Sequence, residues 1–199
     1  MILVIDSATA ACSVALLDGG EVVAELYEEI GRGHAERLLP MISELLGTRR
    51  PSSILADCGP GSFTGVRVGI AAAHGLAIGW QIPLAGYSSM AIVAAAAEAE
   101  EVAVALAGGH GQLFVQSYRN APLEPIDDLR SLTPAEAAGA VAAGLVMGSG
   151  AEALVSARGH GRAVAALPRA GHAALLPEKL RSLPARPIYG RAPDARPMQ

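Results

Sequence analysis

The sequence predicts an α/β protein built from two related lobes. Apolar, β-rich runs alternate with segments of helical spacing along the chain, and each half begins with strands that a helix follows. The 199 residues are 51% hydrophobic and 17% charged, which supplies a core and excludes a disordered chain. The acidic cluster EAEE indicates a boundary, so we expect a first lobe at 1–100 and a smaller, diverged second lobe with an irregular C-terminal tail at 101–199.

The first half begins with three predicted strands. MILVID is a short apolar run that stops at Asp6, which is typical of a buried strand. The next two β-rich runs form a hairpin, because the Asp-Gly-Gly turn at 18–20 lies between them. Helical spacing over 34–46 then predicts a helix, in which Pro40 must cause a bend or remove one hydrogen bond.

A glycine-rich segment, DCGPGSFTGVRVGIAAAHGLA, starts at position 57 after a predicted strand at 53–56. We expect a loop and then a helix from about Thr64 to Gly79, with Ser62 or Thr64 as its N-cap. IPLAGYSSM then predicts a short strand, a loop and a helix that runs over about 90–99.

The second half repeats this theme more weakly. VAVALA, LFVQSY and LVMGSG are the expected strands. TPAEAAGAVAAG is an expected helix, with Thr133 as N-cap and Pro134 in the first helical position.

Composition also limits the partners and the compartment. A formal net charge of −4 argues against a protein that grips nucleic acid by itself. The N-terminal apolar run is interrupted at Asp6 and no basic region precedes it, so we expect no signal peptide. The longest apolar run is too short to span a bilayer. Cys12 and Cys58 offer no disulfide framework, which favours a cytoplasmic protein without a membrane association.

The glycine loop matches neither of the two common phosphate cradles. A P-loop has Lys and then Ser or Thr after its last glycine, whereas Val66 and Arg67 follow Gly65 here. The spacing of Gly59, Gly61 and Gly65 also departs from the dinucleotide fingerprint. The sequence is still compatible with a more general anion site at the start of the helix, because a helix N-terminus presents free backbone N–H groups.

Small residues recur every four positions in the same segment, at Gly61, Gly65, Gly69, Ala73 and Ala77. Each glycine inside a helix costs about 0.5–1 kcal/mol relative to alanine, so the stripe predicts a close backbone approach that compensates this cost. Packing inside the fold and packing at a subunit interface both fit this pattern.

Four segments in this order resemble the bacterial TsaB (YeaZ) family: ILVIDSATAACSVALL, HAERLLPMISELL, GPGSFTGVRVGIAAAHGLA and PIYGR. The similarity is dense over residues 1–93 and thin afterwards. The resemblance implies the two-lobed fold of actin, Hsp70 and the sugar kinases (the ASKHA, ribonuclease H-like fold), here with a reduced second lobe.

The resemblance also implies a function. TsaB proteins are regarded as non-catalytic scaffolds that activate the catalytic subunit TsaD and work with the ATPase TsaE. Together these proteins add threonylcarbamoyl to N6 of adenosine 37 in tRNAs that read codons beginning with A. We therefore expect TsaD-type and TsaE-type partners, a homodimer when the chain is alone, and contact with tRNA only through the complex.

No cofactor is required for such a role, although weak ATP or ADP binding at the partner interface is compatible with it. The alternative is an independent ATPase or kinase of the same fold. A peptidase activity is disfavoured, since Leu38 stands where a second histidine would complete a metal-binding pair with His34. We expect neither catalytic nor metal-binding residues.

Two groups of candidate site residues follow. The remnants of a nucleotide or anion site would be Asp6, Ser7, Gly59, Gly61 and Ser62. The candidate interface residues are His34, Glu36, Leu38, Leu39, Ile42, Gly65, Gly69 and Ala73. The second lobe departs from the family, because Ala107-Gly108-Gly109-His110 stands where relatives often have Asp-Ala-Arg.

Overall fold

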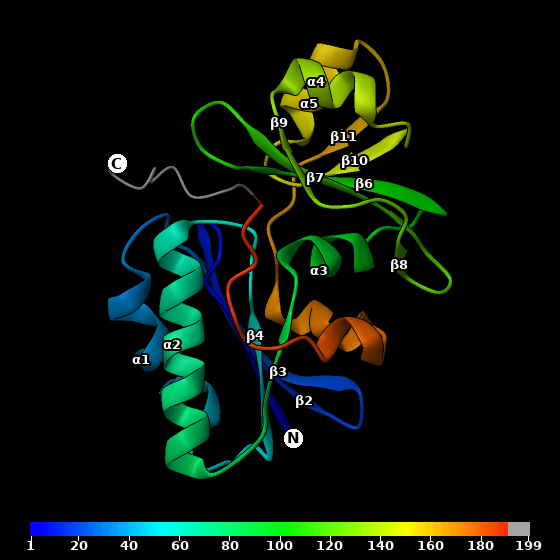
Figure 1. Ribbon diagram of the computed structural model, residues 1–199. Coiled ribbons are helices and arrows are strands. Elements are labelled where there is room, and N and C mark those ends of the chain that lie inside the picture. The colour runs from blue at the N-terminus through cyan, green and yellow to red at the C-terminus, as the bar shows by residue number, and fades with distance from the viewer. Residues whose placement is uncertain (191–199) are drawn as a thin grey trace, which may run out of the picture.

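A computed structural model describes residues 1–190 of the chain, so residues 191–199 of the predicted tail lie outside the described part. It contains two β-sheets, one above the other in Figure 1, with helices on both faces of the lower sheet. The fold is the predicted two-lobed α/β arrangement.

The first sheet has five strands in the order β3-β2-β1-β4-β5. Its strands are β1 (Ile2–Asp6), β2 (Ala11–Asp18), β3 (Glu21–Glu29), β4 (Ser53–Asp57) and β5 (Leu84–Tyr87). Strand β2 is antiparallel to both β1 and β3, whereas β4 and β5 run parallel to β1. As predicted, Gly19 and Gly20 form the hairpin turn, both with positive φ.

The second sheet repeats this topology. It follows the order β11-β10-β6-β7-β8, and β9 also pairs with β7. The antiparallel β7 takes the place of β2 beside a central strand, and the parallel β10 and β11 take the places of β4 and β5. Its strands are β6 (Glu101–Ala107), β7 (Leu113–Arg119), β8 (Glu124–Pro125), β9 (Arg130–Leu132), β10 (Leu145–Met147) and β11 (Arg162–Val164).

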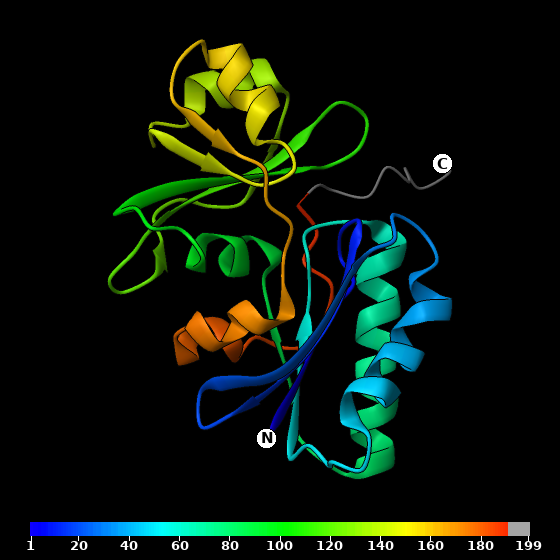
Figure 2. The ribbon, with the colours of Figure 1, turned by 180° about the vertical axis from the view of Figure 1, so that it is seen from behind.

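Helices α1 (His34–Leu46) and α2 (Phe63–Trp80) cover one face of the first sheet, and α3 (Ser89–Ala95) lies on the other side, toward the second lobe (Figures 1 and 2). The predicted bounds of α1 are confirmed, and Pro40 lies inside it. Ser62 is the N-cap of α2, since its side chain accepts a hydrogen bond from the Gly65 N–H. Within the described residues, no helix is both long and apolar enough to cross a membrane.

The second lobe carries two short helices, α4 (Pro134–Ala140) and α5 (Ala151–Arg158). Thr133 caps α4 as predicted, with Glu136 completing a capping box. The helix is shorter than predicted because Val141 is extended and buried in the core of the lobe. The predicted helix over 90–99 likewise ends early, at Ala95.

The chain returns to the first lobe after β11, which differs from the predicted assignment of residues 101–199 to one lobe. The 3₁₀ helices η1 (Ala170–Leu175) and η2 (Glu178–Arg181) contact strands of the first sheet. The carboxylate of Glu25 on β3 accepts hydrogen bonds from the Gly171 N–H at 2.8 Å and from the Arg169 guanidinium at 2.7 Å. These contacts, together with the apolar core below them, attach the returning segment to the first lobe.

Candidate functional site

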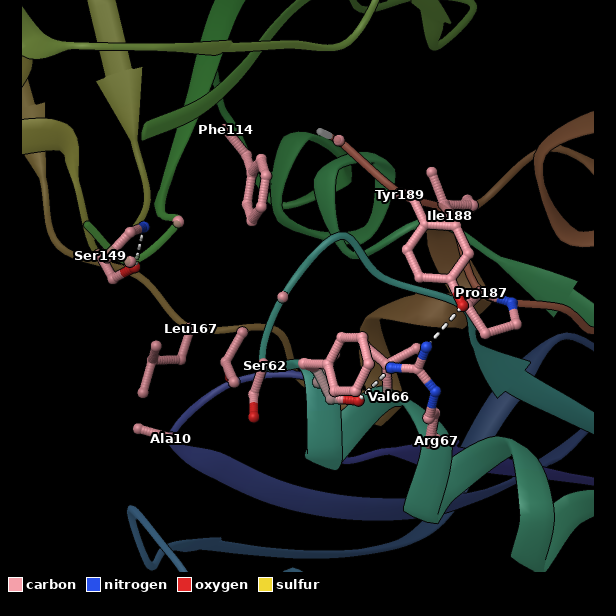
Figure 3. A pocket seen from close by; sticks show the side chains of 18 of the residues that line it. Ala10, Ser62, Val66, Arg67, Phe114, Ser149, Leu167, Pro187, Ile188 and Tyr189 are labelled. Atoms are coloured by element: carbon pink, nitrogen blue, oxygen red, sulfur yellow. Dashed lines mark hydrogen bonds between the residues drawn. The ribbon is translucent and has the colours of Figure 1, made fainter. Parts of the chain in front are cut away.

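A cleft with a volume of about 870 Å³ lies between the two lobes. Its walls come from the turn after β1, the start of α2, the loop between β6 and β7, and the segment 187–190 near the C-terminus (Figure 3). Among the described residues, no aspartate or glutamate lines it. The cleft is therefore an apolar and weakly basic site.

The glycine loop after β4 is fixed by its own backbone contacts. The Ser62 N–H donates to the Ala8 carbonyl at 2.6 Å, and the Ser89 N–H donates to the Gly59 carbonyl at 3.0 Å. A Cβ on Gly61 would overlap the carbonyl oxygen of Ala8, so only glycine permits the approach between this loop and the turn after β1.

Asp6 does not line the cleft, although it ends the first strand as predicted. Its carboxyl group is fully buried, accepts a hydrogen bond from the Tyr87 hydroxyl at 3.0 Å, and interacts electrostatically with the buried carboxyl group of Asp57. Asp57 in turn accepts hydrogen bonds from the Ser89 hydroxyl at 2.7 Å and from the Gly59 N–H at 2.7 Å. The two acids thus form one buried cluster beneath the glycine loop.

Burial raises the pKa of both carboxyl groups. The pKa of Asp57 lies well above its ordinary value, because the charge of Asp6 adds to the cost of desolvation. Two neighbouring buried carboxyl groups oppose each other's ionisation, and this adds to the effect of burial on the pKa of Asp57. Both acids belong to the core, and neither lines the cleft.

The structure separates the five predicted anion-site residues. Gly61 and Ser62 line the cleft, whereas Asp6, Ser7 and Gly59 are buried below the loop. The Ser7 hydroxyl donates to the Gly65 carbonyl at 2.9 Å and so joins the turn after β1 to α2.

Sequence reasoning missed the side chains that shape the cleft. The guanidinium carbon of Arg67 lies 3.3 Å from the centroid of the Phe63 ring, and the same guanidinium donates to the Tyr189 hydroxyl at 2.7 Å. Phe114 on β7 faces them across the cleft (Figure 3). The sequence did contain a signal for this contact: Phe63 and Arg67 are four residues apart at the start of a predicted helix, and residues at this spacing are neighbours on the helix surface.

The glycine stripe packs inside the first lobe, which corrects the prediction that Gly65, Gly69 and Ala73 face another subunit. A Cβ on Gly65 would overlap the Ser7 carbonyl oxygen, and one on Gly69 would lie 2.5 Å from the Ser7 hydroxyl. Ala73 is fully buried in the core between the sheet and the helices. The backbone of the turn after β1 therefore fills the space that the missing side chains leave.

The predicted interface residues on α1 fall into two groups, buried and exposed. His34 is buried and its Nε2 lies 3.1 Å from the Ala11 carbonyl oxygen, while Leu38 and Ile42 belong to the core. Glu36 and Leu39 are exposed, Leu39 to 51%. His34 and Leu38 are thus unavailable to a partner, because they are buried against the first sheet.

An exposed apolar surface remains on the outer side of these helices. A groove of about 590 Å³ lies between α1 and α2 and is lined by Leu39, Ile42, Leu46, Leu76 and Trp80, among others. Ile78 of α2 is 76% exposed. We call this groove the α1–α2 face; an exposed apolar groove of this kind is typical of protein contacts.

Comparisons with known proteins agree on one relationship. The family model described as "TsaD: tRNA N6-adenosine threonylcarbamoyltransferase" matches residues 24–149. The chain is 40% identical over 127 residues to the tRNA threonylcarbamoyladenosine biosynthesis protein TsaB of Escherichia coli, a match covering 59% of this chain and 54% of that protein. It is 42% identical over 114 residues to TsaB of Haemophilus influenzae, covering 53% of this chain and 48% of that protein.

A solved structure extends the similarity over the whole fold. YeaZ from Pseudomonas aeruginosa superimposes with a TM-score of 0.80 at 31% sequence identity, covering 94% of this chain and 98% of that one. The chain thus spans about half the length of the curated relatives it matches, but nearly all of this structural relative.

Proposed function

The chain belongs to the TsaB (YeaZ) family, and from this premise we propose that it is a non-catalytic scaffold of the complex that adds threonylcarbamoyl to N6 of adenosine 37 in tRNA. Its role would be to bind and activate a TsaD-type catalytic subunit, together with a TsaE-type ATPase. The free, buried thiols of Cys12 and Cys58 are compatible with such a complex in the cytoplasm.

The chemistry of the cleft is the observation that carries the proposal. Transfer of a phosphoryl or adenylyl-activated group requires charged residues that hold Mg²⁺ and neutralise the phosphates. Among the described lining residues, Arg67 is the one permanent charge, and the acid at the end of β1 is committed to Asp57. These residues support a subunit role more strongly than an independent ATPase or kinase.

The α1–α2 face is the surface that we assign to the TsaD-type partner, and to a second copy of the chain when the partner is absent. Leu39 would be buried in the contact, and Glu36 would lie at its rim. Contact with tRNA would come through the complex, since the net charge of −4 gives this chain little attraction for nucleic acid. Weak ATP or ADP binding would then depend on groups that the partner supplies at the interface.

Reconstitution tests the proposal directly. The chain is mixed with TsaD-type and TsaE-type proteins, tRNA, ATP, bicarbonate and the upstream enzyme that makes the threonylcarbamoyl donor, and the modified nucleoside is quantified. We expect formation of the nucleoside to require this chain. Equal yield without the chain would reject the scaffold role.

A second measurement separates the alternative. Calorimetry with ATP and Mg²⁺ on the isolated chain should give no tight one-to-one binding and no turnover. Tight binding with hydrolysis would favour the independent ATPase or kinase.

A further inference from the structure

The cleft between the lobes has the dimensions and the lining of a small-molecule site. Its volume of about 870 Å³ falls in the range of about 300–1,000 Å³ that is typical of ligand pockets. Apolar side chains from distant segments form opposite walls, with Phe114 from the second lobe, Leu167 from the connection between the lobes, and Ile188 from near the C-terminus. These side chains offer apolar contact to a ligand from more than one wall.

Phe63 offers a stacking surface inside this cleft. The Arg67 guanidinium covers one face of the ring, with its central carbon 3.3 Å from the ring centroid. Phe63 still keeps 70% of its surface exposed, so the opposite face of the ring is open. An aromatic molecule placed there would extend an existing stack of cation and ring.

The position of Arg67 is fixed without any ligand. Its guanidinium donates hydrogen bonds to the Phe63 carbonyl at 3.0 Å and to the Tyr189 hydroxyl at 2.7 Å. Neither acceptor is a carboxylate, and within the part of the chain that the structure describes Arg67 forms no ion pair. The charge on this wall is therefore preorganised and not neutralised.

We propose that the cleft binds a planar aromatic molecule that carries a single negative charge. The ring stacks on the open face of Phe63, and the charge lies in the field of Arg67. A Mg²⁺-bound triphosphate fits poorly, because its several charges would meet one cation and no carboxylate that could hold the metal. This inference goes beyond the proposed function and does not depend on it.

Titration of the intact chain with two matched probes tests the inference. Naphthoate carries the ring and one negative charge, and naphthamide carries the same ring without the charge. Calorimetry should show saturable binding of both, with naphthoate bound about fivefold more tightly, since one partly exposed charge pair contributes about 1 kcal/mol. Mg²⁺-ATP should bind more weakly than naphthoate.

Two variants assign the binding to its residues. Arg67→Met keeps the long side chain and should abolish the preference for naphthoate over naphthamide. Phe63→Ala should lower the affinity for both probes about tenfold, because it removes the stacking surface. Arg162→Met is the matched control, since this exposed arginine lies on β11 away from the lining of the cleft.

The readouts can contradict the inference even when the chain works as a scaffold. Equal affinity for the two probes in the unsubstituted chain would refute the role of Arg67. Binding of naphthoate that is unchanged in Phe63→Ala would show that the probe occupies another surface. Circular dichroism of each variant separates a lost site from a lost fold, and the activity of the reconstituted complex is measured independently.

Discussion

The carboxyl groups of Asp6 and Asp57 are both buried at the carboxyl ends of the neighbouring parallel strands β1 and β4, where the charge of Asp6 adds to the effect of burial in raising the pKa of Asp57. This burial turns an aspartate at the predicted position of a phosphate-binding group into a core residue. Tyr87, at the end of the next parallel strand, donates the hydrogen bond that completes the cluster.

The first prediction concerns the pH dependence of stability. Burial raises the pKa of Asp57 in the folded chain, so above a pH of about 4 the folded state binds more protons than the unfolded state. The stability due to this group is therefore present at low pH and is lost as the pH rises toward the raised pKa. Asp57→Asn keeps the shape without the ionisation, and should flatten the profile of unfolding free energy over the pH range that rises from about 4 toward the raised pKa.

Urea unfolding over this range provides the measurement for Asp57→Asn. At the alkaline end the variant should be more stable than the unsubstituted chain, by about 1 kcal/mol for each unit of raised pKa. Asp128→Asn, at an exposed position, should leave the profile unchanged. A profile equally steep in Asp57→Asn would contradict the raised pKa of Asp57.

The second prediction separates two kinds of glycine in α2. Gly65→Ala should destabilise the chain by about 1–3 kcal/mol, because the new Cβ overlaps the Ser7 carbonyl oxygen. Gly75→Ala is the matched control, since no atom lies within 4 Å of its added Cβ, and it should stabilise the helix by about 0.5–1 kcal/mol. Urea denaturation compares the two, and changes of the same sign would argue against the packing described for this helix.

The third prediction tests the α1–α2 face. Leu39→Glu should weaken association with a TsaD-type partner about tenfold or more, because a charge would be buried in the contact. The Leu39 side chain is exposed, so thermal stability should change little. Sedimentation or calorimetry gives the affinity. Ile126→Glu, at an exposed apolar position between β8 and β9, is the control, and an equal loss of affinity there would remove the argument for this face.

The fourth prediction concerns the segment that returns to the first lobe. Glu25→Ala should cost about 1–3 kcal/mol of stability, since it leaves the Gly171 N–H and the Arg169 guanidinium without their acceptor. Hydrogen exchange should accelerate at η1 before the rest of the chain. Glu21→Ala on the same strand is exposed and should change neither quantity. Unchanged protection of η1 would mean that its apolar contacts suffice.

The sequence determined the local elements and the family. The spacing of apolar residues located α1, the two hairpin glycines located the first turn, and Ser62 and Thr133 marked the starts of two helices. These signals are local, because caps and turns depend on residues within a few positions of each other. The same short motifs identified the TsaB family.

Only the tertiary structure decided which surfaces those elements share. A four-residue stripe defines one face of α2, but the register of β1 and β4 places the backbone of Ser7 against that face. The pairing of Asp6 with Asp57, and the meeting of Phe63, Phe114 and Tyr189 around one cleft, likewise join residues that are distant in the chain. Periodicity fixes the direction in which a side chain points, whereas its partner depends on how strands and lobes assemble in space.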